Sequence, residues 1–156
     1  MLKKIKIISI VILSLVFTSC GFKKINSGEK LVNIQELNVS GEKRQAYFLK
    51  NNIYLISNKN AENLYDIDIK LTNKKTSKIK DATGKITRYN INISANFLMK
   101  NKRTKKTITR IFNRKNDYNI AKSYSDTINN EKNATKNIID QLSDDIITFI
   151  TLSINN

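Results

Sequence analysis

The chain has 156 residues, with 28 Lys and Arg against 13 Asp and Glu, one Cys, and no His, Trp or Pro. The absence of His excludes Ser-His-Asp and Cys-His catalytic relays and imidazole metal ligands, and a single Cys excludes an internal disulfide or a thiolate zinc site. This length favours one domain that buries about two-thirds of the surface exposed by its unfolded chain. We therefore expect a modest folded domain without the commonest catalytic groups.

The formal net charge of +15 has two interpretations. A basic surface attracts partners that carry phosphates, because it raises their local concentration. Lys, Asn and Ile are abundant along the whole chain, however, as expected of a biased coding composition that replaces Arg with Lys and Leu with Ile. The places where the charges cluster therefore matter more than their total.

The first residues have the pattern of an export signal. Three lysines within Met1–Lys6 precede an apolar run from Ile7 to Val16 that is interrupted only by two serines. This run is shorter than the ~20 residues that a membrane-spanning helix needs. The pattern predicts a signal peptide that is removed from the mature protein.

The only cysteine follows this apolar run, in Phe17-Thr18-Ser19-Cys20-Gly21. The stretch resembles a bacterial lipobox, in which the cysteine thiol receives a diacylglycerol and the chain is cut before the cysteine. The new amino group is then acylated. We expect residues 1–19 to be a lipoprotein signal peptide and Cys20 to be the lipid attachment site, with its acyl chains and no other cofactor. The alternative, an unmodified cysteine behind an ordinary signal peptide, is disfavoured because no A-x-A cleavage site is present.

The start of the mature chain indicates how the protein is held and where. Residues 20–30 are polar and predict a lipidated N-terminal tether, followed by a single domain over residues 31–156. Two or three acyl chains hold a protein on a membrane far more firmly than one chain does. Bacteria often place Asp directly after the lipidated cysteine to retain lipoproteins in the inner membrane, whereas Gly21 stands here. The resemblance therefore implies an outer-membrane protein, lipid-anchored on the periplasmic side.

The beginning of the domain contains one strand and one ambiguous segment. Leu31–Val39 is apolar enough for a first strand. Residues 41–56 fit either a helix or a hairpin around Asn51-Asn52, and Ser40 as a possible N-cap favours the helix. The helical interpretation places four apolar residues on one face: Ala46, Leu49, Ile53 and Ile56.

Two clear strands and a returning strand follow. Apolar residues alternate with polar ones from Tyr65 to Leu71 and from Tyr89 to Phe97, the period that puts one face of a sheet on a core. Lys100–Lys106 is predicted to be a turn, and Thr107–Tyr118 a strand that runs back, so an antiparallel meander is expected. A second group of basic residues is assigned to a loop between the first two of these strands: Lys74, Lys75, Lys78 and Lys80.

From Asp126 onwards the period becomes helical. An apolar stripe needs a surface to cover, and the sheet is the obvious one. Asp144 and Asp145 are assigned to the solvent side of this helix. The expected fold is α+β in two layers: an antiparallel or mixed sheet of about four strands packed by one short helix and one long C-terminal helix. The stripe consists of Ile128, Ala134, Ile138, Leu142, Ile146 and Ile150, with Ile139 and Phe149 beside it.

Short motifs, in this order, resemble the LptE family of lipopolysaccharide-assembly lipoproteins, in particular its alphaproteobacterial type. The similarity spans most of the mature chain, although each motif alone is unspecific. The matching stretches are Cys20-Gly21-Phe22, Tyr65-Asp66-Ile67, Ile86-Thr87-Arg88 before Tyr89-Asn90-Ile91, and Asp117-Tyr118-Asn119 ahead of Tyr124 and the helical run Ala134–Ile150.

The resemblance implies a non-catalytic protein with three partners. The domain would plug the LptD β-barrel translocon, assist its assembly and help insert lipopolysaccharide into the outer leaflet, while its acyl chains hold it in the inner leaflet of the outer membrane. A barrel interior is polar and wet, and the outward face of the second clear strand offers uncharged polar groups for it. A solvent-facing sheet explains the same face equally well. These groups are Asn90, Asn92, Ser94 and Asn96.

Basic residues near the predicted turn are the candidates for binding the phosphates of lipopolysaccharide through charge-assisted hydrogen bonds. Arg110 and Arg114 extend this set along the returning strand, on one side of it. The alternatives are a solvated turn that discourages edge aggregation and ordinary surface charge. The densest cluster is Lys100, Lys102, Arg103, Lys105 and Lys106.

Other function classes fit less well. A stand-alone periplasm-facing lipoprotein that binds an acidic envelope polymer or another envelope machine shares every feature above, so only its partner distinguishes it. Nucleic acid is excluded as a partner by export and by basic stretches that lack interleaved aromatic residues. Asp66 and Asp68 share a strand face but have no second acidic pair, phosphate loop or metal constellation beside them, so we predict no enzyme and no metal site.

Overall fold

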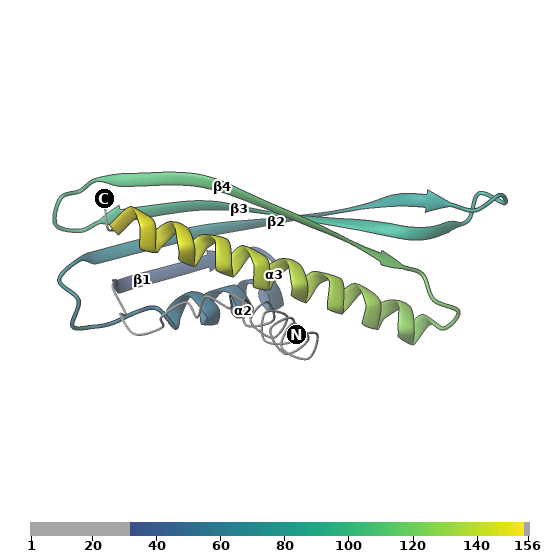
Figure 1. The fold of residues 1–156 in the computed structure, drawn as a ribbon, viewed down its shortest axis with the longest axis horizontal. Coiled ribbons are helices and arrows are strands. Elements are labelled where there is room, and N and C mark those ends of the chain that lie inside the picture. Colours follow the sequence, from purple (N-terminus) through teal and green to yellow (C-terminus); the bar gives the residue numbers. More distant parts are fainter. Residues whose placement is uncertain (1–31, 155–156) are drawn as a thin grey trace, which may run out of the picture.

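The computed structural model describes residues 32–154, so the predicted signal peptide, the tether over residues 20–30 and Cys20 lie outside the described residues. Two helices and four strands follow one another within these described residues (Figure 1). They are β1 (Asn33–Ser40), α2 (Lys43–Tyr54), β2 (Leu64–Lys80), β3 (Ile86–Asn101), β4 (Thr107–Asn119) and α3 (Tyr124–Ile154).

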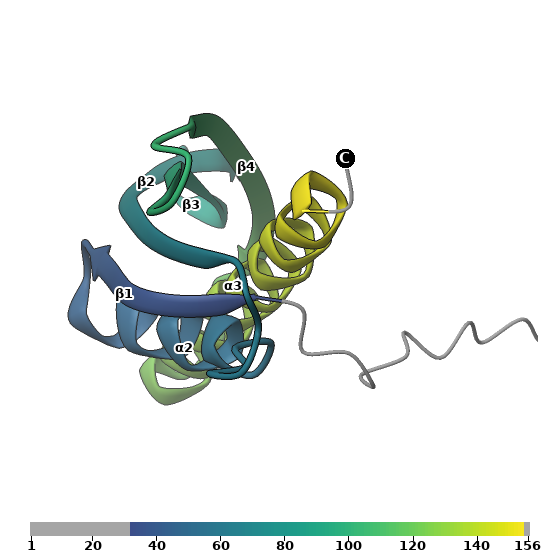
Figure 2. The ribbon, with the colours of Figure 1, turned by 90° about the vertical axis from the view of Figure 1, so that its left-hand side faces the viewer.

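The four strands form one mixed sheet in the order β1-β2-β3-β4. β1 is parallel to β2, and α2 makes the crossover between them. The other two pairs are antiparallel hairpins. Both helices pack on the same side of the curved sheet, as the end-on view in Figure 2 shows. The predicted α+β fold with two layers is therefore confirmed.

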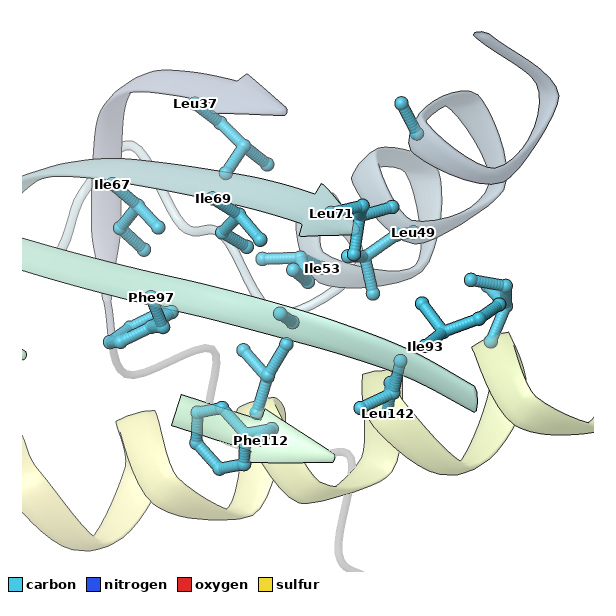
Figure 3. Close-up of a cluster of buried hydrophobic side chains, with 14 of the residues drawn as sticks. Leu37, Leu49, Ile53, Ile67, Ile69, Leu71, Ile93, Phe97, Phe112 and Leu142 are labelled. Atoms are coloured by element: carbon cyan, nitrogen blue, oxygen red, sulfur yellow. The ribbon is translucent and has the colours of Figure 1, made fainter. Parts of the chain in front are cut away.

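The core lies between the sheet and the two helices. The predicted alternation holds in β2 and β3, where the residues at every second position are buried and face the helices (Figure 3). Phe97 and Phe112 approach edge to face, and Phe149 of α3 completes the cluster with ring centroids 5.7 Å from both. The inward positions are Tyr65, Ile67, Ile69 and Leu71 in β2 and Ile91, Ile93, Ala95, Phe97 and Met99 in β3.

The long helix α3 supplies the other half of this core. Its apolar stripe is buried as predicted from Ala134 to Ile150, and at about 1.5–3 kcal/mol for each fully buried large side chain it makes a major contribution to stability. Ser143 lies inside this stripe without an unpaired hydroxyl, since it donates to Ile139 O at 2.7 Å and accepts from the Asn52 amide at 3.0 Å. This contact also connects α3 to α2.

The ambiguous segment 41–56 contains the helix α2, so the helical interpretation is confirmed, but the predicted cap is wrong. The N-cap residue is Glu42, without a side-chain cap hydrogen bond. Ser40 is instead the last residue of β1, and its hydroxyl donates to Ile69 O at 3.4 Å. The chain reverses at Gly41, whose φ of +131° is open to glycine but strained for other residues.

The prediction of a loop for the second lysine group is wrong. β2 continues to Lys80, and its second half pairs with β3 in register, for example Lys75 with Ile91. Lysine was mistaken for a loop signal because the apolar alternation ends at Leu71. The strand persists beyond that point because it is held by its partner strand, not by burial of its own side chains. A short turn then closes the hairpin, where the Asp81 carboxylate accepts from the backbone N–H groups of Thr83 and Lys85 at 2.9 and 3.0 Å.

Candidate functional site

The basic turn between β3 and β4 is a defined structure. Asn101 organises it, because its side-chain oxygen accepts from the backbone N–H groups of Arg103 and Thr104, both at 2.9 Å. Backbone hydrogen bonds of 2.9 Å from Lys105 to Asn101 and from Asn101 to Lys106 close the turn. Lys105 sits at a φ of +60°, the left-handed conformation that this closure needs. The turn therefore presents its cations from a fixed backbone.

Two of the five cations in this cluster have partners. Lys102 lies 3.5 Å from a carboxylate oxygen of Asp66 on β2, and Arg103 donates to Glu62 O at 3.3 Å. Among the described residues, no carboxylate pairs with Lys100, Lys105 or Lys106, all of which are exposed. The turn therefore offers at least three ammonium groups to a phosphate-bearing ligand.

Arg110 and Arg114 lie on one side of β4, as predicted, and this side faces α3. The guanidinium of Arg114 makes a two-pronged ion pair with Asp145, with both N–O distances at 2.6 Å. These hydrogen bonds to Asp145 raise the pKa of Arg114. The guanidinium of Arg110 lies 5.3 Å from the ring centre of Phe112 and 4.8 Å from that of Phe149, within the range of cation–π attraction.

These contacts give both arginines a role in holding the edge strand on α3. They also correct the assignment of Asp145 to the solvent side of the helix, since its carboxylate is directed at Arg114. Asp144 is exposed, as predicted. Each arginine therefore offers less to a ligand than the unpaired lysines of the turn.

The outer face of the sheet is polar and is not covered by any helix or strand of the described chain (Figure 2). Uncharged amides and hydroxyls dominate its centre, where the Ser94 hydroxyl donates to the side-chain oxygen of Asn113. Toward one end of the face, the Asn90 amide donates to the Asp117 carboxylate at 2.7 Å. The hydrogen bonds from Lys78 and Asn90 lower the pKa of Asp117. The predicted outward positions of β3 all lie on this face, namely Asn90, Asn92, Ser94 and Asn96.

One surface was missed from the sequence. The side of α2 that faces away from the core carries large exposed apolar residues, and a groove of about 720 Å³ runs beside it, between α2 and α3. The signal was present: in a helix of this register, apolar residues occupy both faces. The same apolar residues also suit a hairpin, so the sequence alone does not place them on an exposed helix face. The exposed residues are Tyr47, Phe48, Tyr54 and Leu55.

The described residues hold no group of three or more His, Cys, Asp or Glu side chains placed to bind a metal ion. No helix among residues 32–154 has the length and apolar character to cross a membrane. Three surfaces of the described residues have a distinct character: the basic turn, the uncovered sheet face and the outer face of α2.

Comparisons with known proteins give a likeness of fold. The chain is similar to the crystal structure of rare lipoprotein B from Shewanella oneidensis, at 14% identity and a TM-score of 0.61, covering 78% of this chain and 96% of that one. It is also similar to a Caulobacter crescentus structure named as a lipoprotein, at 11% identity, a TM-score of 0.56, and coverage of 83% and 95%. A minor lipoprotein from Acinetobacter baumannii matches at 15% identity, a TM-score of 0.54, and coverage of 80% and 94%.

No family model and no curated protein matches the sequence. At these identities the likeness to the solved structures establishes the fold alone. The match extends over nearly the whole length of each solved chain. The chain thus has the α+β fold that these bacterial lipoproteins share. The likeness extends over three different bacteria and does not single out the alphaproteobacterial type.

Proposed function

We propose that this protein is an outer-membrane lipoprotein of the LptE kind, which plugs an LptD-type β-barrel, assists its assembly and helps insert lipopolysaccharide into the outer leaflet. The observation that carries the proposal is the fold shared with rare lipoprotein B, which is LptE. The lipobox-like stretch ending in Cys20 supports an acyl anchor ahead of this fold. The protein would then be held in the inner leaflet and face the periplasm.

The uncovered sheet face supports the role of a plug. The inside of a large transmembrane barrel is polar and water-filled, so a protein that enters it needs a surface of hydrogen-bonding groups without a dense charge of one sign. The face around Ser94 and Asn113 has this character, whereas Lys74 and Lys115 flank Asn92 on the neighbouring strands. Its amides can exchange bonds with water for bonds with the barrel wall at little cost.

The basic turn supports contact with lipopolysaccharide. Its unpaired lysines can form charge-assisted hydrogen bonds with the phosphates of a lipid headgroup. We assign the main contribution to Lys100, Lys105 and Lys106, and a smaller one to Lys102 and Arg103. Arg110 and Arg114 contribute least, because Asp145 and the Phe112 and Phe149 rings already engage them. The role is binding and needs no covalent step, so we propose no enzyme activity and no cofactor besides the acyl chains on Cys20.

Affinity purification from detergent-solubilised outer membranes tests the partner. The tagged wild type is expected to bring down a large β-barrel. Asn92→Glu with Asn96→Glu, which adds two charges to the outer sheet face, is expected to lose it, whereas Glu substitutions at Tyr124 and Lys122, away from that face, should retain it. If the wild type captures no barrel but binds an acidic envelope polymer, the stand-alone lipoprotein is the correct function.

The anchor and the ligand have separate tests. Metabolic labelling with a palmitate analogue is expected to mark the wild type and not Cys20→Ser, and equal labelling would exclude the anchor. Replacing the five cations from Lys100 to Lys106 with Gln is expected to weaken lipopolysaccharide binding and to reduce its dependence on salt. Unchanged binding would leave this segment as a solvated turn.

A further inference from the structure

α2 carries large apolar side chains on both of its faces. Leu49 and Ile53 on the inner face are fully buried against the sheet and α3 (Figure 3). On the outer face Tyr47 is 63% exposed and Leu55, which ends the helix, is 72% exposed, with Tyr54 beside them. Large apolar side chains that gather on an exposed surface mark sites of interaction with proteins or membranes. Within the described chain, nothing covers this outer face.

The charged residues of α2 itself all have one sign, although Glu42, Glu131 and Asp140 line the groove beside Arg44 and Phe48. α2 contains Lys43, Arg44 and Lys50 and no acidic residue. Two of the cations lie over aromatic rings of the same helix: the Arg44 guanidinium is 5.8 Å from the ring centre of Phe48, and the Lys50 ammonium is 5.8 Å from that of Tyr54. Aromatic rings flanked by cations suit the headgroup region of an anionic bilayer, where the rings enter the apolar boundary and the cations meet phosphates.

The chain enters the fold beside this helix. Val32, the first described residue, forms a parallel bridge with Ser57, and its carbonyl accepts from the backbone N–H of Asn58 at 2.7 Å. Both partners follow the last turn of α2. Cys20 lies about 12 residues upstream of Val32, and a fully extended chain of that length reaches at most about 40 Å. A lipid anchor on Cys20 would therefore keep the end of α2 within about 40 Å of the bilayer.

We propose that the outer face of α2 docks on the anionic phospholipid surface that holds the anchor. This inference rests on the proposed lipidation of Cys20, but not on the barrel or on lipopolysaccharide. It describes the protein outside a barrel: the firm attachment through the acyl chains and a weaker one through α2 together restrict how the domain lies on the membrane. In this orientation the polar outer sheet face, on the opposite layer, is turned away from the lipid (Figure 2).

Vesicle flotation tests the docking without the anchor. The probe is the chain from residue 20 to 156 carrying Cys20→Ser, which has no acyl chain but includes every described residue. It is expected to bind vesicles of phosphatidylethanolamine and phosphatidylglycerol and not vesicles of phosphatidylcholine. Tyr47→Ser with Leu55→Ser, or Lys43→Gln with Arg44→Gln and Lys50→Gln, is expected to weaken binding at least about tenfold.

Matched controls come from other surfaces. Ile111→Ser removes an apolar side chain that is 65% exposed, between the 63% of Tyr47 and the 72% of Leu55, from the outer sheet face. The triple change Lys74→Gln, Lys80→Gln and Lys115→Gln removes the same charge as the triple change in α2. Both controls should retain vesicle binding to within about twofold. A wild type that does not bind the anionic vesicles, or controls that lose binding as much as the α2 variants, would overturn the proposal.

Tryptophan fluorescence tests the same docking while keeping an aromatic side chain at position 47. Because the chain has no Trp, Tyr47→Trp places a single tryptophan on the outer face of α2, and its emission can be excited apart from that of the tyrosines. Its emission should shift to the blue on addition of anionic vesicles, whereas Tyr124→Trp, at a position that is 82% exposed at the start of α3, should not shift. Equal shifts, or none, would contradict the docking. Palmitate labelling of the wild type tests the acylation of Cys20 independently of vesicle binding. A failure of the anchor hypothesis can therefore be told apart from a failure of the α2 docking hypothesis.

Discussion

The ammonium of Lys75 lies 2.9 Å from a carboxylate oxygen of Glu131, and this ion pair joins the second half of β2 to the first half of α3. The same carboxylate oxygen accepts a hydrogen bond of 2.9 Å from the hydroxyl of Tyr118 on β4. The ammonium also lies 4.8 Å from the ring centre of Tyr89 and 5.2 Å from that of Tyr118, and these two rings stack. Three strands and the long helix therefore meet at one polar contact, beyond the end of the apolar core of β2.

Replacing Lys75 with Gln should lower the free energy of unfolding by about 1 kcal/mol, since a partly exposed ion pair and a partly exposed cation–π contact each contribute no more than about 1 kcal/mol. Urea unfolding measures this change. Lys74→Gln is the matched control, because Lys74 points to the opposite face of β2 and has no carboxylate partner among the described ion pairs. It should change stability by less than about 0.5 kcal/mol. Equal effects at both positions would contradict the assigned role of Lys75.

The same contact predicts a loss of stability at alkaline pH. Burial, followed by the hydrogen bond to Glu131, raises the pKa of Tyr118 above 10.0, against an opposing effect of Lys75. For Lys75, burial lowers the pKa, but hydrogen bonds with Tyr118 and Glu131 outweigh it and the pKa is raised above 10.5. Both groups hold their protons more tightly in the folded state. The stability that they contribute is therefore complete below about pH 10 and is lost as the pH rises through their folded pKa values.

Tyr118→Phe checks this origin. Removing the titrating hydroxyl should reduce the steepness with which the free energy of unfolding falls above about pH 10, although the variant starts from a lower stability at neutral pH. Urea unfolding at a series of pH values gives the slope. Tyr124→Phe, at an exposed tyrosine, should leave the slope unchanged. An identical slope in wild type and Tyr118→Phe would exclude Tyr118 as the source.

The apolar pattern was sufficient to predict most of the fold. Strict alternation from Tyr65 to Leu71 and from Tyr89 to Phe97, and the helical stripe from Ala134 to Ile150, each reflect burial of one face, and burial follows directly from side-chain periodicity. What failed depends on neighbours that are distant in sequence. The strand from Asn73 to Lys80 persists because β3 pairs with it, and no periodicity of its own residues reports this.

The candidate site shows the same division. The exposed turn could be located from its five cations, because a dense local cluster of charge needs no partner to be recognised. The engagement of Arg114 with Asp145 could not, because the two residues are 31 positions apart and meet only when α3 packs on β4. The outer face of α2 was missed for a different reason: its apolar residues suited a hairpin as well as a helix.

Substitutions at Arg114 are expected to lower stability, whereas substitutions of the turn lysines are expected to weaken lipopolysaccharide binding. Arg114→Gln and Asp145→Asn should each lower the free energy of unfolding by a small amount, and the double variant should be no less stable than the worse single one, because both remove the same pair. Lipopolysaccharide binding by Arg114→Gln should change little. Lys105→Gln with Lys106→Gln should show the reverse, weaker binding at unchanged stability. If Arg114→Gln weakens binding as much as the lysine pair does, its guanidinium contacts the ligand in spite of Asp145.

Gly41 and Gly84 both have a positive φ, but an added side chain would meet close neighbours only at Gly41. A Cβ at Gly41 would lie 2.8 Å from Cβ of Leu71 and 2.9 Å from its carbonyl oxygen, with φ at +131°. Gly41→Ala therefore combines backbone strain with a clash between the β1–α2 connection and the middle of β2, and should cost at least about 3 kcal/mol. At Gly84, φ is +82° but nothing lies within 4 Å of the added atom, so Gly84→Ala should cost about 1 kcal/mol, from strain alone. Thermal unfolding of both variants measures the difference. A larger loss of stability in Gly41→Ala than in Gly84→Ala would show that the contact of Gly41 with Leu71, directly before α2, adds to the cost of the backbone strain. Equal losses in the two variants would assign the whole cost to the backbone angle.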